Sequence, residues 1–203
     1  MGFALLIAGF AGLDGPLYRF ALTLNTAEVG HVGADDFYQR TKFIWYALRI
    51  PAGVTAALVA FFAILLFHPR AWRIAIPMLC GAAAASAVTF VARGLIGRMR
   101  PNIGEHPWTF HPLERLIASD RVCFPSGEAT AAFALACVLT RAAPRWAPLW
   151  YALATAAALA RLVQGAHFLS DVVGGAMVGV FVAGGFMDRL TRTYFAEPAA
   201  LAR

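Results

Sequence analysis

The chain has 203 residues, of which 60% are hydrophobic and only 14% are charged, and its mean hydropathy is +0.66. Soluble proteins carry about 45–50% apolar and about 25% charged residues, so this composition excludes an ordinary soluble domain and indicates an integral membrane protein of one domain, residues 1–203. The net charge of +6 does not indicate a nucleic-acid partner, because the basic residues are spread among apolar segments and form no basic face.

The first third of the chain contains two apolar segments separated by a polar one. Residues 2–24 are apolar overall but contain ionisable residues, so they predict a first membrane helix that is broken or partly interfacial. One of these residues, Asp14, has no obvious partner in the sequence. Residues 25–42 predict a polar loop. Residues 43–67 form the clearest span, interrupted only by Arg49, and their length of about 25 residues exceeds the roughly 20 that a bilayer requires.

Four further apolar segments follow, at residues 74–92, 128–140, 146–160 and 172–187. Small residues at 81–85 and 175–179 would let neighbouring helices approach closely, as helix interfaces in membranes prefer. No internal repeat indicates a transporter built from two halves. We therefore predict an all-α fold, an integral membrane bundle of about six transmembrane helices.

The polar ends of these segments meet on one side of the membrane when the chain is followed back and forth across it. Ionisable side chains at membrane depth are costly and indicate a functional site by default. The residues gathered on that side are Arg93, Arg100, Ser126, Glu128, Arg161, His167 and Asp171. We therefore predict an active site at one membrane face.

Two residue spacings favour a catalytic site over isolated charges. His167 and Asp171 are four residues apart, which makes them neighbours on a helical turn. A carboxylate there can accept a hydrogen bond from one ring nitrogen and leave the other nitrogen free to react. Arg93 and Arg100 are seven residues apart and share one helix face if the helix continues to Pro101, where the proline would end it.

An anion-binding turn is indicated just before the segment that starts at residue 128. Ser126 and Gly127 precede a helix, whose first backbone N–H groups are free to bind an anion. Arginine side chains suit the multidentate recognition of phosphate. With His167 as a nucleophile, these features predict phosphoryl transfer through a phosphohistidine, with the arginines stabilising the developing charge.

Three dispersed motifs together resemble a known family. In order, they are Arg93-x6-Arg100-Pro101, Pro125-Ser126-Gly127-Glu128 and Arg161-x5-His167-x3-Asp171. Their order and spacing, over residues 93–171, are similar to the type 2 phosphatidic acid phosphatase family, whose pattern is Lys-x6-Arg-Pro, Pro-Ser-Gly-His and Ser-Arg-x5-His-x3-Asp. That family includes lipid phosphate phosphatases, bacterial lipid A phosphatases and, more distantly, vanadium haloperoxidases. Its membrane members have six helices.

The resemblance implies a role for each matching residue. His167 would attack phosphorus and Asp171 would orient it. Phosphate would be bound by Arg93, Arg100, Ser126, the backbone of Gly127 and Arg161. Neither a metal nor another cofactor would be needed.

Glu128 is the main departure from the family pattern, because it stands where relatives have the histidine that protonates the leaving group. Glutamic acid can also act as a general acid, although its reference pKa is about 4.3 against about 6.5 for histidine. Alternatively, Glu128 complements the dipole of the helix that follows it. Two milder departures are Arg93 in place of lysine and Ala160 in place of the serine before Arg161.

The sequence predicts a membrane phosphatase acting on a phosphorylated lipid such as lipid A, phosphatidylglycerophosphate, phosphatidic acid or a polyprenyl diphosphate. Two alternatives stay open: a lipid-to-lipid phosphotransferase, and a non-catalytic lipid-phosphate carrier in which Glu128 marks lost chemistry. Basic stretches at 68–73, 141–145 and 188–203 favour the opposite side as cytoplasmic, so the active site would face the periplasm or exterior of a bacterial-type inner membrane. No obligatory protein partner is expected.

Two other residue groups do not indicate metal or disulfide sites. The loop that contains His106 and His111 has a spacing that does not favour metal binding. The three cysteines, Cys80, Cys123 and Cys137, have a spacing that indicates neither a disulfide framework nor a metal site.

Overall fold

The computed structural model describes residues 6, 9–24, 35–50, 53–68, 71–103, 106–113 and 120–194. Within these ranges the extended elements are all helices, and the strand-like pairings are isolated bridges between Arg98 and Phe110 and between Met99 and Val122. The predicted all-α class is confirmed.

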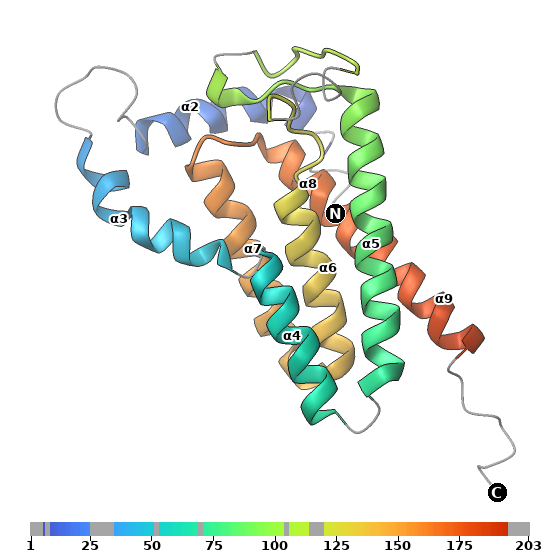
Figure 1. Ribbon diagram of the computed structural model, residues 1–203. Coiled ribbons are helices and arrows are strands. Elements are labelled where there is room, and N and C mark those ends of the chain that lie inside the picture. Colours follow the sequence, from blue (N-terminus) through green and yellow to red (C-terminus); the bar gives the residue numbers. More distant parts are fainter. Residues whose placement is uncertain are drawn as a thin grey trace, which may run out of the picture.

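A bundle of long helices surrounds α6, which runs from Gly127 to Ala142. Around it are α4 (Val54–Phe67), α5 (Ala71–Ile96), α7 (Ala147–Val163) and α8 (Leu169–Val178), and α8 continues through a π-helical turn at Gly179–Ala183 into α9 (Gly184–Tyr194) (Figure 1). Three helical segments of the described chain are long and apolar enough to cross a bilayer: Ala71–Ile96, Pro144–Val163 and Leu169–Leu190. The count of about six transmembrane helices stays a prediction.

The later apolar segments each correspond to one helical rod. α6, α7 and the continuous α8–α9 rod contain the segments predicted at 128–140, 146–160 and 172–187. α5 is longer at both ends than the predicted segment 74–92. Hydrophobic length therefore located these helices correctly, with errors of a few residues at their ends.

The prediction of one continuous helix over residues 43–67 is wrong. α3 (Asp35–Leu48) ends before Arg49, and α4 begins only at Val54. The sequence has Pro51 between them, and proline lacks a backbone N–H and disfavours helical geometry in the residue before it. α3 also begins inside the segment predicted as a polar loop, so that prediction is wrong in part.

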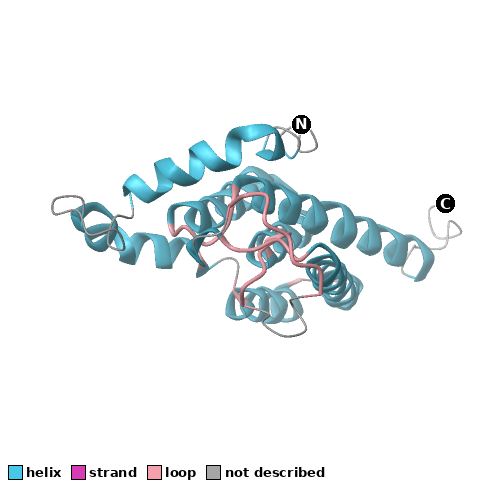
Figure 2. Ribbon diagram, turned by 90° about the horizontal axis from the view of Figure 1, so that it is seen from above, coloured by secondary structure: helices cyan, strands magenta, loops and turns pink. Residues whose placement is uncertain are grey.

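The N-terminal segment is broken, as expected. A π-helical turn, Gly9–Leu13, is kinked at Gly12, where φ is 135°, and α2 (Asp14–Leu24) follows. At about 1.5 Å per residue, the 11 residues of α2 are too short to cross a bilayer. α2 instead runs across one end of the bundle (Figures 1 and 2). Residues 2–5, 7 and 8 of the predicted span lie outside the described residues.

Small residues bring helices into close contact, as predicted. A Cβ atom added at Gly175 would lie 2.3 Å from the backbone oxygen of Ser126, and one at Gly81 would lie 2.8 Å from that of Ala183. Real Cβ contacts are never that short, so these positions require glycine. The contact at Gly175 brings the second half of α8 against the start of α6.

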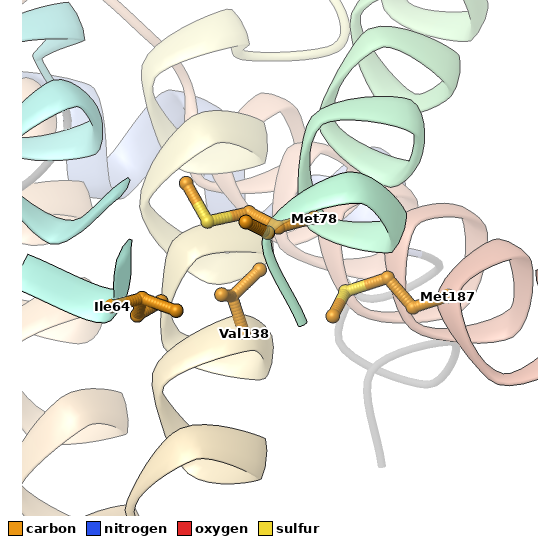
Figure 3. Close-up of a cluster of buried hydrophobic side chains, with 5 residues drawn as sticks. Ile64, Met78, Val138 and Met187 are labelled. Carbon is orange, nitrogen blue, oxygen red and sulfur yellow. The ribbon is translucent and has the colours of Figure 1, made fainter. Parts of the chain in front are cut away.

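Large apolar side chains pack together at the end of the bundle opposite to the one that α2 crosses. Ile64, Met78, Val138 and Met187 come from α4, α5, α6 and α9 and form one buried cluster (Figure 3). Lipid tails are as apolar as these side chains, so their contribution is van der Waals packing between helices. The cluster packs these four helices together at the end of the bundle away from α2.

Candidate active site

The polar residues converge at the end of the bundle where α5 and α7 end and α6 and α8 begin (Figure 1), which we call the motif end. The loop that joins α5 to α6 passes over this end, and loops gather above the centre of the helices (Figure 2). The structure therefore brings the predicted segment ends together on one side.

His167 and Asp171 form a buried pair. His167 lies in the turn between α7 and α8, Asp171 lies in the first turn of α8, and their side chains are 2% and 0% exposed. The distance from Nδ1 of His167 to Oδ2 of Asp171 is 3.5 Å, longer than a hydrogen bond. Such contacts are often long in free enzymes and shorten when substrate binds.

Burial sets the charge state of His167. It lowers the pKa of the imidazole to about 4, against the opposing effect of Asp171 and with a smaller contribution from the positive charges of Arg100 and Arg161. The imidazole is therefore neutral at neutral pH, which is the form that can act as a nucleophile.

Ser126 and Gly127 form the start of α6 beside this pair. Ser126 is the N-cap, and its fully buried Oγ accepts a hydrogen bond of 3.4 Å from the backbone N–H of Ala129. The backbone N–H of Ser126 donates to the backbone oxygen of Asp171 at 2.9 Å. The turn predicted to bind an anion is therefore fixed against the helix that holds Asp171.

Arg93 reaches the same turn from the last turn of α5. Its Nε donates to the backbone oxygen of Pro125 at 2.8 Å, and a Cβ atom at Gly127 would lie 3.2 Å from its Nη2. Glycine thus allows the guanidinium to lie directly against the turn. Arg93 therefore lies beside the turn formed by Ser126 and Gly127, and its role in phosphate binding stays a prediction.

The helix does not continue to Pro101, so Arg93 and Arg100 do not share one helix face. α5 ends at Ile96, and Gly97 follows with φ of +62°, the left-handed conformation in which glycine commonly ends helices. Arg100 lies beyond the helix, where its backbone N–H donates to the oxygen of Arg121 at 2.8 Å. It still comes close enough to His167 to affect its pKa.

Glu128 lies between two arginines. Nη2 of Arg49 is 2.8 Å from Oε1 and its Nε is 3.2 Å from Oε2, while Nε of Arg161 lies 2.9 Å from Oε2. Arg161 also donates to Oε1 of Gln164 at 2.6 Å. Glu128 is thus held by one predicted phosphate-binding arginine and by Arg49, which sequence reasoning treated only as an interruption. A lone charge in the longest apolar segment was the available signal.

Arg98 is the second residue that sequence reasoning missed. It is fully buried and donates to Oδ1 of Asp171 at 2.9 Å, to Oδ2 of Asp14 at 2.7 Å, to the backbone oxygen of Pro107 at 2.9 Å and to Oγ of Ser170. Asp14 therefore does have a partner, 84 residues away along the chain. The presence of a second arginine two residues before Arg100 was the only local signal.

One group of described residues could offer ligands to a metal ion: Cys123, His167 and Asp171, whose ligand atoms lie within 4.8 Å of one another. Burial and the charge of Asp171 raise the pKa of the Cys123 thiol well above its ordinary value. A thiolate is the form that binds metals, and this environment disfavours it. The oxygens of Asp171 also already accept hydrogen bonds from Arg98 and from the backbone of Phe168. The group fits a hydrogen-bonded network better than a metal site.

Comparison with known proteins decides the family. Residues 74–193, more than half of the chain, match the model of the PAP2 superfamily. The chain belongs to the PAP2 superfamily. The matched range contains every predicted site residue, from Arg93 to Asp171, but not Asp14 or Arg49. The family resemblance of the motifs is thereby confirmed.

A solved structure has the same fold as this PAP2 chain. It is described as the "Crystal structure of the first transmembrane PAP2 type phosphatidylglycerolphosphate phosphatase from Bacillus subtilis". The TM-score is 0.65 with 16% identity, over 96% of this chain and 95% of that one. At that identity the likeness shows the fold alone. Among curated proteins, no sequence matches the chain.

Proposed function

We propose that this PAP2 protein is a membrane phosphatase that removes phosphate from a lipid through a phosphohistidine at His167. The observation that carries the proposal is the buried, neutral imidazole of His167 beside Asp171, with Arg100 and Arg161 close to it. Membership of the PAP2 superfamily supports a phosphatase. The roles of the individual residues are part of the proposal.

In the first step the lipid phosphate binds among Arg93, Arg100, Arg161 and the turn formed by Ser126 and Gly127. Nε2 of His167 attacks phosphorus, the N–P bond forms, and the bond from phosphorus to the lipid oxygen breaks. Asp171 stabilises the imidazolium charge that develops on the ring. The arginines stabilise the charge on the transferring phosphoryl group, and no metal ion takes part.

Glu128 is the proposed proton donor to the departing lipid oxygen. In the free protein its carboxylate binds Arg49 and Arg161. Substrate phosphate would replace it on Arg161, which leaves Oε2 with only the longer contact to Nε of Arg49, so that this oxygen can carry a proton. After the proton has passed to the lipid oxygen, the carboxylate takes one from the water that attacks the phosphohistidine, and inorganic phosphate leaves.

A groove beside the site suits the hydrocarbon chain of the substrate. It has a volume of about 330 Å³ and lies between α4, α6 and α7, with lining residues that include Ile50, Val59, Leu135, Trp150 and Leu153. Ile50 is the neighbour of Arg49, so the groove begins next to the Arg49–Glu128 contact. A lipid could therefore place its chain in the groove and its phosphate at His167.

The proposed setting is a bacterial-type inner membrane, with about six transmembrane helices forming one domain. The motif end would face the periplasm or exterior, because Arg73 at the start of α5, Arg141 in the last turn of α6 and Arg145 just before α7 lie at the other end of the bundle. The substrate is a phosphorylated lipid of the lipid A, phosphatidylglycerophosphate, phosphatidic acid or polyprenyl diphosphate type. Phosphatidylglycerophosphate is the first to test, since it appears in the description of the similar structure.

The test measures phosphate release by the purified protein from each of these lipids in detergent micelles. Wild type should turn over at least one, and His167→Ala should reduce the rate by at least about 10³-fold, in line with the loss of a catalytic nucleophile. An acid-labile, alkali-stable phosphoenzyme should form from labelled substrate in wild type only. Binding of every lipid without turnover or phosphoenzyme would refute the proposal in favour of a carrier. Faster phosphate transfer to an added acceptor lipid than to water would identify a phosphotransferase.

Glu128→Gln tests the proton donor separately. Loss of a general acid typically costs about 10²- to 10⁴-fold, and we expect a loss in this range for lipid monoesters. The loss should be much smaller for aryl phosphates, because their leaving groups depart without a proton. Equal effects on both substrate types would leave Glu128 as an ion-pair partner without an acid role.

A further inference from the structure

A buried ionic cluster links the N-terminal helix to the proposed catalytic pair, through Asp14, Arg98, Ser170 and Asp171. We propose that Arg98 and Asp14 are positioning residues for the reaction: Arg98 fixes the carboxylate of Asp171 against His167, and Asp14 holds Arg98 and balances its charge. This inference rests on the proposed function, because the residue it positions is the proposed nucleophile.

The cluster is completely withdrawn from solvent. The side chains of Arg98 and Asp171 are 0% exposed and that of Asp14 is 2% exposed. A buried charge left without a partner is strongly destabilising, so these three groups have to remain together. The guanidinium also lies over the ring of Phe168, 4.4 Å from its centroid, which fixes its plane. Arg98 is therefore held in one position from several directions.

The two oxygens of Asp171 have different partners. Oδ1 accepts from Nη1 of Arg98 at 2.9 Å. Oδ2 accepts from the backbone N–H of Phe168 at 2.8 Å and faces Nδ1 of His167 at 3.5 Å. Because both oxygens accept hydrogen bonds, the carboxylate cannot rotate and turn Oδ2 away from the imidazole. Arg98 thus determines which oxygen is presented to the imidazole.

Asp14 adjusts the charge of this arrangement. Alone, Arg98 would neutralise Asp171 and weaken its attraction for the imidazolium that forms during phosphoryl transfer. Because Nη2 of Arg98 also binds Oδ2 of Asp14 at 2.7 Å, two carboxylates share one guanidinium. Net negative charge therefore remains beside His167 when it becomes positive.

Further contacts hold α2 in the position in which Asp14 reaches Arg98. Oδ1 of Asp14 accepts from the backbone N–H of Ser170 at 3.0 Å, and its Oδ2 accepts from Oγ of Ser170 at 2.5 Å. Tyr18 donates to the backbone oxygen of Pro101 at 2.7 Å and packs edge-on against Phe168. α2 therefore bonds both to the first turn of α8 and to the residue that follows Arg100. A segment outside the matched family range completes the site.

The test must separate positioning from a purely structural link between helices. Asp14→Asn retains the shape of the side chain and removes its charge, and Arg98→Lys retains a buried cation and removes the fork. The matched control is Asp188→Asn, which breaks the Arg141–Asp188 ion pair at the other end of the bundle. A structural link would change the amount of folded protein, whereas positioning changes kcat in the folded fraction.

We expect Asp14→Asn to lower kcat by about 10- to 100-fold with KM within about twofold of wild type, as is typical for partners that orient a reacting group. Arg98→Lys should also lower kcat, and Asp188→Asn should change neither constant. Only protein that elutes as a single folded species is assayed.

A second measurement does not depend on turnover. The chain contains five histidines, so nitrogen-15 labelling of histidine gives few ring signals, and His167→Gln identifies those of His167. Asp14→Asn and Arg98→Lys should shift the Nδ1 signal of His167, and Asp188→Asn should not. This result would support the inference even if wild type released no phosphate, a case in which the proposed function alone would fail.

The inference is overturned if wild type is active and Asp14→Asn is folded with unchanged kcat and an unchanged Nδ1 signal. If Asp14→Asn does not fold, Arg98→Lys decides in the same way, because it keeps the buried charge. A fall in kcat with no change at the Nδ1 atom would also contradict it, since the effect would then not act through His167.

Discussion

Two ionic clusters reach His167, one through Asp171 and the other through Arg161, and they differ in how far they are exposed to solvent. In one, Arg98 binds Asp14 and Asp171, and all three side chains are at most 2% exposed. In the other, Glu128 binds Arg49 and Arg161, and the Glu128, Arg49 and Arg161 side chains are 31%, 32% and 10% exposed. The first we call the buried cluster and the second the half-exposed cluster.

The difference indicates what each cluster can do. Separating buried ion partners leaves an uncompensated charge in a medium of low dielectric, so the buried cluster cannot exchange partners at reasonable cost. Arg49 and Glu128 are solvated when they separate, and their pairing is worth only about 0.2–1 kcal/mol. Arg161 is only 10% exposed, but an arriving phosphate would replace Glu128 as its partner. The buried cluster therefore suits a fixed support for the nucleophile. The half-exposed cluster suits contacts that open when a phosphate arrives.

Among the variants that test the difference between the two clusters, Arg98→Ala should have the largest effect, which is on the free energy of unfolding. It leaves Asp14 and Asp171 facing each other without their shared cation, which should lower the free energy of unfolding by about 3–5 kcal/mol. The measurement is unfolding by sodium dodecyl sulfate in mixed micelles. Arg141→Ala is the matched control, because its partner Asp188 is 46% exposed, and should cost at most about 1 kcal/mol. Similar losses in the two variants would mean that burial does not separate fixed ion pairs from exchangeable ones in this protein.

The titration of His167, which contacts Asp171 of the buried cluster, should be visible in the free energy of unfolding. Its pKa is about 4 when folded and 6.5 in the reference state, so between these values the unfolded chain binds more protons. Stability should therefore rise with pH from about 4 to 6.5, by at most about 1.4 kcal/mol per pH unit from this group. The measurement compares unfolding free energies at several pH values for wild type and His167→Gln. An identical slope in both would show that His167 titrates normally.

The fold could be predicted largely because hydrophobic length is a strong local signal. α6, α7 and the α8–α9 rod are where uninterrupted apolar segments place them. The prediction of one helix over residues 43–67 is wrong because the apolar sequence continues past Arg49, although α3 ends at Leu48. Hydropathy does not detect a proline such as Pro51, because proline disfavours a helix through its backbone. The end of α3 is therefore determined by local backbone geometry and not by hydrophobic composition.

The site was predictable where its chemistry is local in sequence. His167 and Asp171 are four residues apart and do come together, although His167 lies in the turn before α8 and not on the same helical turn as Asp171. The Ser126–Gly127 turn precedes α6, as expected. Arg98 and Asp14 are 84 residues apart, and neither residue implies the other until α2 is placed across the motif end. The residues found only in the structure are thus those whose partners depend on tertiary packing.

Arg49→Gln should give the smallest and most discriminating effect, because it acts on the half-exposed cluster alone. In wild type, phosphate has to compete with Glu128 for Arg161. Removing Arg49 leaves Glu128 to Arg161 and should weaken the binding of inorganic phosphate by about 1.4- to 5-fold, whereas Glu128→Gln should strengthen it. The measurement is calorimetric titration with phosphate. If Arg49 acts through Glu128, the double variant Arg49→Gln/Glu128→Gln should bind phosphate as tightly as Glu128→Gln alone. Independent, additive effects on phosphate affinity would instead mean that Arg49 contacts the phosphate itself and that the half-exposed cluster does not open.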